Sequence, residues 1–126
     1  MNMSAAAPAS RPIHARLLGE QCDGEVWQLH LQLPADLVYF DGHFPQAPVL
    51  PGAVQIAWAL QLAAPRLGTS TSCRELEALK FQQLLRPDDR VTLSLRLDAR
   101  GKLHFSYRRG DIAYSSGRLL LGEPHE

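Results

Sequence analysis

The sequence DGHFPQAPVLPGAVQIAWALQ, residues 41–61, places one histidine in a loop framed by glycine and proline and then starts a long apolar helix. Proline and glycine restrict or redirect the backbone, so this composition is typical of a loop with a defined shape. The N-terminus of a helix offers unpaired N–H groups and the positive end of the helix dipole, which favour an anion. We therefore interpret His43 as a candidate base beside an anion site.

The helix is predicted to run from residue 53 to about residue 64, where every side chain is uncharged. Alanine, leucine and glutamine favour helix, and Pro65 is predicted to end it. A helix that is apolar on nearly every face has to be buried. The rest of the chain is therefore expected to wrap around it.

Alternation of apolar and polar residues predicts two strands before the helix. Residues 13–18 and 26–33 are expected to form a hairpin, with the polar run 19–25 as its turn and Pro34 as its end. One face of the second strand carries large apolar side chains: Trp27, Leu29, Leu31 and Leu33.

Further strands are predicted after the helix. Residues 74–85 form a longer strand candidate whose apolar parity shifts between Ala78 and Leu79, which indicates a bulge. Three cleanly alternating runs separated by turn sequences predict an antiparallel meander: residues 91–98, 103–108 and 112–121. The predicted fold is α+β, a single antiparallel sheet of five to six strands curled around one central helix. Its edge strands would be exposed, and a symmetric dimer joined edge to edge would cover them.

Length, charge and cysteine content limit the class of protein. The 126 residues predict one domain, residues 12–126, after a disordered tail of residues 1–11 that is rich in Ala, Ser and Pro. The 13 basic and 13 acidic residues cancel, which disfavours nucleic acid or an anionic membrane surface as a partner. The first residues lack the features of a signal peptide or a membrane anchor. Two isolated cysteines suit a reducing compartment, so we expect a cytoplasmic protein.

The loop GHFPQAPVLPG followed by AVQIAWALQ resembles the hotdog-fold (3R)-hydroxyacyl-thioester dehydratases of fatty acid synthesis. That family has the pattern GHFPxxPxxPG and then an alanine-rich helix with a carboxylate and, four residues later, a glutamine. The segment LKFQQLLRPDDRVTLSL is similar to the family's second segment, so the resemblance covers nearly the whole chain after the tail. Within the superfamily, the helix motif Val-Gln-x-x-Trp-Ala resembles that of the dehydratase-like proteins of aryl polyene clusters.

The resemblance implies a homodimer with two active sites at the subunit interface. The substrate would be an acyl thioester on acyl carrier protein or coenzyme A, and no cofactor or metal is implied. His43 corresponds to the general base that removes the proton alpha to the thioester carbonyl, and the N–H of Gly52 to the donor that binds the carbonyl oxygen. Gln61 corresponds to the glutamine that positions the carboxylate or a water. Phe44 and Val49 are the further substrate-binding candidates.

One position departs from the family pattern. The family's general acid lies on the helix of the opposite subunit, five residues after the helix-opening glycine, and this position is Ala57. Losing a positioned acid forfeits roughly 10²- to 10⁴-fold in rate. Asp41 is the nearest carboxylate in sequence and could orient the imidazole or cap a turn. Gln55 is predicted to point away from Ala57, whereas a water held by Gln61 could substitute for the acid.

Simpler interpretations exist for each candidate residue. His43 in isolation is equally a structural turn residue, and Gly52 is what a tight Pro-Gly turn requires. The other histidines lack ligand spacing and predict no metal site: His14, His30, His104 and His125. Four arginines could meet an acidic carrier protein or a phosphopantetheine phosphate, although solvated turn charges are the simpler interpretation: Arg86, Arg90, Arg108 and Arg109.

Three functions fit the sequence. The first is a 3-hydroxyacyl-thioester dehydratase in which His43 acts as base and returns the same proton to the departing hydroxyl. The second is a hotdog thioesterase, which uses the same fold and pocket but gains nothing from Ala57. The third is a non-catalytic acyl-binding or scaffold subunit, paired with an active paralogue in a heterodimer that supplies the missing carboxylate.

Overall fold

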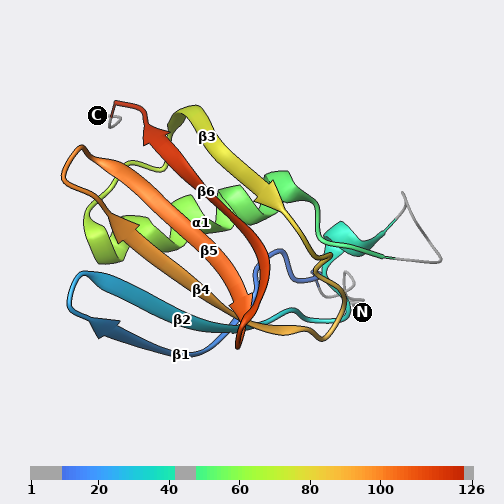
Figure 1. Ribbon diagram of the computed structural model, residues 1–126. Helices are drawn as coiled ribbons and strands as arrows, with labels where there is room; N and C mark the ends of the chain where they lie inside the picture. Colours follow the sequence, from blue (N-terminus) through green and yellow to red (C-terminus); the bar gives the residue numbers. More distant parts are fainter. Residues whose placement is uncertain (1–9, 42–47, 124–126) are drawn as a thin grey trace, which may run out of the picture.

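The computed structural model describes residues 10–41 and 48–123, which form a six-stranded antiparallel sheet and one long helix (Figure 1). In chain order the elements are β1 (Arg16–Asp23), β2 (Val26–Gln32), the 3-10 turn η1 (Val38–Phe40), α1 (Gly52–Leu67), β3 (Cys73–Phe81), β4 (Arg90–Leu97), β5 (Lys102–Arg109) and β6 (Ile112–Leu121). The strands lie in the order β1-β2-β4-β5-β6-β3, so β1 and β3 are the edges. The predicted sheet of five to six strands around a central helix is confirmed.

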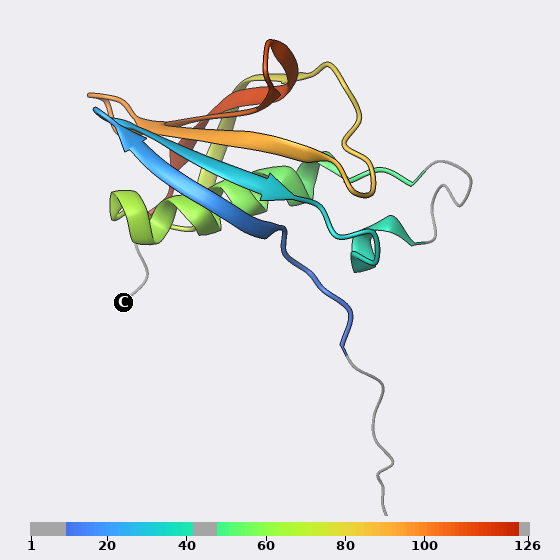
Figure 2. The same cartoon turned by 90° about the horizontal axis from the view of Figure 1, so that it is seen from below.

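The core lies between α1 and the concave face of the sheet, which arches over the helix (Figure 2). The inward residues of neighbouring strands face each other: Leu29 pairs with Leu93, and Leu95 pairs with Phe105. All four side chains are buried, whereas their sequence neighbours on the opposite face are more exposed. Burying each such side chain contributes about 1.5–3 kcal/mol. The predicted alternation in β2, β4 and β5 is therefore confirmed.

Strand β1 lies further along the chain than predicted, although the hairpin with β2 is confirmed. The prediction of 13–18 was too early, because Asp23 pairs directly with Val26. The short turn between them contains Gly24 at a φ of 63°, the left-handed conformation that glycine adopts readily. The polar run before Gly24 was taken for a turn, but an edge strand exposed to water needs few apolar residues.

Strand β3 contains the predicted irregularity. Its register with β6 shifts between Glu77 and Lys80, and Ala78 has a φ of 51°. A positive φ is uncommon for a residue with a Cβ, so this confirms the predicted bulge. The strand ends at Phe81, earlier than the predicted residue 85, because the next two amides both donate to the carbonyl of Tyr114.

The prediction that Pro65 ends the helix was wrong. Pro65 lies in the last turn of α1, where its missing N–H removes only the hydrogen bond to the carbonyl of Gln61. The helix ends after Leu67, where Gly68 adopts a φ of 68° and donates its N–H to Ala64. Within the described residues, no helix has the length and apolar character needed to cross a membrane.

Asp98 organises the turn between β4 and β5. Its Oδ1 accepts hydrogen bonds from the amides of Arg100 and Lys102 at 2.8 and 3.0 Å. Its Oδ2 lies 2.7 Å from Nε2 of His104. The contact with His104, followed by the amide of Lys102, lowers the pKa of Asp98 from 3.8 to about 2.

The Asp98→Asn variant is expected to lose less stability in acid than the wild type. A carboxylate with a depressed folded-state pKa stabilises the fold fully above its ordinary pKa, and this contribution disappears as the pH falls through the folded-state value. The free energy of unfolding of the wild type should therefore fall more steeply than that of the variant from about pH 4 to about pH 2. The difference in slope corresponds to the uptake of up to about one additional proton on unfolding. Thermal unfolding at a series of pH values measures this. The expectation would be contradicted if the stability of the two proteins fell equally steeply below about pH 4.

Candidate active site

His43 and Phe44 lie within residues 42–47, outside the described residues, so the roles expected for them stay predictions. The structure describes the two ends of this loop. The chain enters it after η1 and leaves it towards α1 (Figure 1). Different sets of hydrogen bonds hold the two ends.

Arg11 holds the entry to the loop, although the sequence assigns it to an N-terminal tail. Its Nε donates to the carbonyl of Asp36, and its Nη2 to that of Leu37, both at 3.0 Å. Its Nη1 donates to the carboxylate of Asp41, the last described residue before the loop. The carbonyl of Pro12 also accepts an amide of η1 at 3.1 Å. The planar guanidinium thus joins three acceptors on one short segment.

Asp41 is poorly suited to replace the missing general acid. The hydrogen bond from Arg11 lowers the pKa of the Asp41 carboxyl below its ordinary 3.8. The group is therefore ionised at neutral pH and has no proton to donate.

Leu50 holds the exit from the loop. Its buried side chain lies in the core, and its amide donates to the carbonyl of Leu85 at 2.8 Å. Its carbonyl accepts a hydrogen bond from Nε2 of Gln55 at 3.2 Å. Val49, a predicted substrate-binding residue, is half-buried beside it. The segment that leads into α1 is therefore fixed to the sheet and to the helix.

Gly52 is the first residue of α1 and follows the N-cap Pro51. Within the described ranges, neither Gly52 nor Ala53 donates its N–H to another residue, and the first turn contains no acidic side chain. The helix dipole and these N–H groups can therefore act on an anion. Gly52 lacks a positive φ, so the simpler interpretation as a turn glycine does not hold. A Cβ there would lie 2.7 Å from Cζ of Phe81, so this ring packs directly against the backbone of Gly52 and would have to shift for any larger residue.

A buried hydrogen-bond network under the first turn of α1 was missed by the sequence reasoning. Oε1 of Gln55 accepts a hydrogen bond from Oγ of Ser115, and the backbone carbonyl of Gln55 accepts one from the Tyr107 hydroxyl, each at 2.6 Å. Burial raises the pKa of Tyr107 above its ordinary 10.0, so the hydroxyl remains a donor. The signal in the sequence was one amide side chain in an otherwise apolar helix start, followed much later by a serine that breaks the apolar parity of β6.

Only one face of α1 is buried, so the prediction of a helix buried on every side was wrong for the single chain. The buried residues are Gln55, Trp58, Ala59, Leu60 and Ala63. Ala53 and Gln61 are exposed and Ala57 is half-buried. At about 100° per residue these three share the face turned away from the sheet. The position of the family's acid therefore lies on the side of the helix that the sheet leaves uncovered.

Cavities flank α1 on both sides. Gln61 lines one of about 260 Å³, together with His14, Leu17, Leu31, Trp58 and Leu62. Nε1 of Trp58 donates to the carbonyl of Ile13 at 3.1 Å and ties the chain before β1 to the helix. The other cavity, of about 500 Å³, lies beside the edge strand β3 and is lined by Ala53, Ile56, Cys73, Arg74, Glu75 and Leu76. The predicted site residues Gly52 and Gln61 therefore lie at separate places along one helix.

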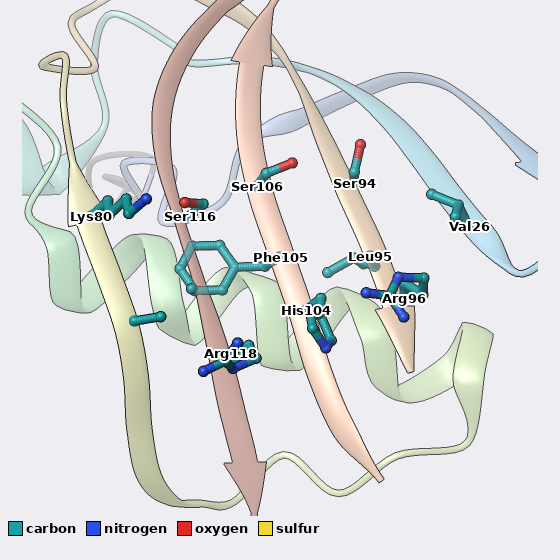
Figure 3. Close-up of a pocket in the computed structure, with 12 residues that line it drawn as sticks. Val26, Lys80, Ser94, Leu95, Arg96, His104, Phe105, Ser106, Ser116 and Arg118 are labelled. Carbon is teal, nitrogen blue, oxygen red and sulfur yellow. The ribbon is translucent and has the colours of Figure 1, made fainter. Parts of the chain in front are cut away.

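The sheet face opposite α1 carries a polar depression of about 340 Å³ (Figure 3). Ser94 pairs with Ser106, which pairs with Ser116, so three hydroxyls form a row across the sheet. The next row contains Arg96, His104 and Arg118. Glu77 neutralises part of this charge, since its Oε1 lies 3.3 Å from Nε of Arg118. The sheet separates this depression from α1, so we assign it to the solvated face.

Three of the four predicted arginines gather in a smaller depression of about 230 Å³: Arg90, Arg108 and Arg109. Arg86 is not among its lining residues. None of these three forms an ion pair with an acidic residue in the part of the chain that the structure describes. Within residues 10–41 and 48–123, no three histidine, cysteine or acidic side chains gather closely enough to hold a metal ion.

The family model described as ApeI-like, ApeI dehydratase, matches residues 19–118 of the chain. The 3-hydroxyacyl-[acyl-carrier-protein] dehydratase FabZ of Oenococcus oeni is 33% identical over 67 residues, which are 48% of this chain and 48% of FabZ. FabZ of Novosphingobium aromaticivorans is 30% identical over 94 residues, 68% of this chain and 54% of that protein. The chain thus spans about half the length of the curated relatives it matches.

Two solved structures are similar to the fold. A chain of the dehydratase heterocomplex ApeI:P from Xenorhabdus doucetiae superposes with a TM-score of 0.79 at 28% identity, covering 87% of this chain and 99% of that one. An uncharacterized protein from Erwinia carotovora subsp. atroseptica gives a TM-score of 0.65 at 30% identity, covering 86% and 96%.

Proposed function

Because the chain belongs to the ApeI-like dehydratase family, we propose that it removes water from a 3-hydroxyacyl group held as a thioester, in fatty acid or polyene synthesis. The membership confirms the predicted hotdog-fold dehydratase resemblance. One observation carries the assignment of the site: α1 begins at Gly52 with N–H groups that make no hydrogen bond within the described residues.

The proposed reaction is an elimination across the alpha and beta carbons. His43 takes the proton from the alpha carbon, and the N–H of Gly52 donates to the thioester oxygen as negative charge develops there. The carbon–carbon double bond forms as the hydroxyl leaves from the beta carbon. The hydroxyl needs one proton to leave as water, and in a reaction with a single base this is the proton that His43 removed. Phe44 and Val49 would line the acyl group.

The source of that last proton is the unusual part of the proposal. Ala57 has no ionisable proton. Asp41 is ionised because of its hydrogen bond from Arg11, and Gln55 points into the core. The remaining donors are the protonated His43, a water held by Gln61, or a carboxylic acid from a different subunit. Each of them predicts slower dehydration by a homodimer than by a site with a positioned carboxylic acid.

A dimer joined through β3 is part of the proposal. The edge of β3 and the segment after it expose large apolar side chains: Leu76, Phe81 and Leu84, at 46%, 50% and 54%. An exposed apolar strand edge beside an open apolar cavity favours pairing with a second sheet. A homodimer would place Ala57 of one subunit near the helix start of the other. The similarity to a chain of a dehydratase heterocomplex supports a paralogue as the alternative partner.

The carrier and the compartment are also proposed. Acyl carrier protein and coenzyme A both present the thioester, and the arginines Arg90, Arg108 and Arg109 would suit either phosphate or acidic side chains. We place the protein in the cytoplasm, because Cys22 and Cys73 are free thiols, as a reducing compartment would keep them.

Enoyl absorbance tests the function directly. The purified protein is expected to convert a 3-hydroxyacyl thioester to the enoyl thioester, measured on acyl carrier protein and on coenzyme A. Release of free thiol is followed in the same samples. Thiol release without enoyl absorbance would identify a thioesterase. Absence of both signals, alone and with a co-expressed paralogue, would refute the proposal.

A further inference from the structure

We propose that Gln55 is a positioning residue that holds the Gly52 N–H at the place where the thioester oxygen binds. The inference rests on the proposed function, and it adds a residue that the family resemblance did not point to. Gln55 does not touch the substrate in this proposal. It acts through the segment between Leu50 and Gly52.

The side chain of Gln55 bridges the segment that opens the helix. Its Nε2 donates to the carbonyl of Leu50 at 3.2 Å, reaching back over Pro51 and Gly52. On its other side Leu50 donates its amide to Leu85 at 2.8 Å. Leu50 is therefore held from both its amide and its carbonyl, and the position of Gly52 follows from that of its neighbours.

The sheet fixes the orientation of the Gln55 amide. Ser115 of β6 donates its hydroxyl hydrogen to Oε1 at 2.6 Å, so the NH2 group must face Leu50. Tyr107 of β5 donates to the backbone carbonyl of Gln55 at 2.6 Å. Gln55 and Ser115 are 3% and 0% exposed, so water cannot replace a lost partner without rearrangement. The first turn of α1 is thus registered against two central strands by hydrogen bonds.

This registration matters because an oxyanion donor works only in a narrow geometry. A displacement of about 1 Å at a reacting centre can cost about 10²-fold in rate. A purely apolar residue at position 55 would fill the core equally well, but it would leave the Leu50 carbonyl and the Ser115 hydroxyl without their partner. The network therefore does more than pack the helix on the sheet.

The test compares Gln55→Met, which keeps the size and removes both side-chain hydrogen bonds, with Leu103→Val. Leu103 is fully buried in β5 and pairs with Leu97 and Leu119, away from the helix start. We expect Gln55→Met to lower kcat for dehydration about 10- to 100-fold with KM changed less than threefold. Leu103→Val should lower the melting temperature and leave kcat of the folded protein within twofold.

A second readout does not depend on activity. The amide of Leu50 should exchange with solvent at least tenfold faster in Gln55→Met, while the amides of β4 and β5 keep their wild-type rates. If wild-type dehydration proves absent, the proposed function fails, and this exchange rate alone decides whether Gln55 holds the segment. Unchanged exchange at Leu50 together with unchanged kcat would overturn the inference.

Gln55→Glu provides the conservative rescue, and it remains informative if Gln55→Met does not fold. A neutral glutamic acid can donate to Leu50 and accept from Ser115, whereas its carboxylate cannot donate. Burial raises the pKa of such a carboxyl, so kcat relative to wild type should rise as the pH is lowered towards about 6. A ratio that stays constant with pH would count against the positioning role.

Discussion

Replacing His43 with alanine is expected to lower kcat/KM for dehydration by about 10²- to 10⁴-fold. The proton alpha to a thioester is weakly acidic, so removing it without a positioned base leaves only water as the acceptor. Steady-state kinetics on a 3-hydroxyacyl thioester, followed through enoyl absorbance, measures the loss. If the variant keeps the wild-type rate, His43 is not the base.

His104→Ala is the matched control for this variant. His104 lies on the outer face of the sheet, where its Nε2 is 2.7 Å from Oδ2 of Asp98. Removing its imidazole should leave kcat/KM within about twofold, because it lies on the side of the sheet away from α1. A large loss in both variants would indicate a general effect on folding. Melting temperatures of the two variants check this separately.

The Ala57→Glu variant is expected to dehydrate faster than the wild type, by about 10- to 100-fold. A carboxylic acid on the uncovered face of α1 can protonate the departing hydroxyl across the proposed dimer interface. The gain should fall short of the 10²- to 10⁴-fold of a fully positioned acid, because the surrounding side chains have not been adjusted to it. The same enoyl absorbance assay measures the gain.

Ala64→Glu is the control, since Ala64 is half-buried like Ala57 and follows it by seven residues, about two helical turns. This position adds the same charge to the same face, but away from the helix start. Equal gains in both variants would indicate a nonspecific effect of charge. No gain in Ala57→Glu, combined with strong activity of a co-purified paralogue complex, would favour the heterodimer in which the partner supplies the carboxylate.

Much of the fold could be predicted from the sequence because its strands carry their own pattern. β4 and β5 alternate strictly, and each alternation matches a buried face in the structure. The bulge near Ala78 was visible as a change of parity. β1 was misplaced because an edge strand is specified by its ladder with β2 rather than by its own side chains. The end of the helix was misplaced because a proline destabilises a helix according to its position, and Pro65 lies in the last turn.

Only part of the candidate site could be predicted in the same way. The motif around Gly52 could be recognised in the sequence, and the structure adds the ring of Phe81 packed against that glycine. The network around Gln55 could not be predicted, because it joins residues 52 and 60 positions apart in the chain. Hydrogen bonds of this kind follow from the strand order, which the alternation of single strands does not specify.

The contact of Arg11 with three acceptors beside η1 has a practical consequence for protein production. Its guanidinium contacts the residues that lead into the loop, from a segment that precedes the first strand. A shortened version starting at residue 12 would keep every helix and strand but would lose these hydrogen bonds of Arg11. Trimming the N-terminus to aid crystallisation would therefore alter the surroundings of Asp41, and a fusion tag should be joined ahead of residue 10.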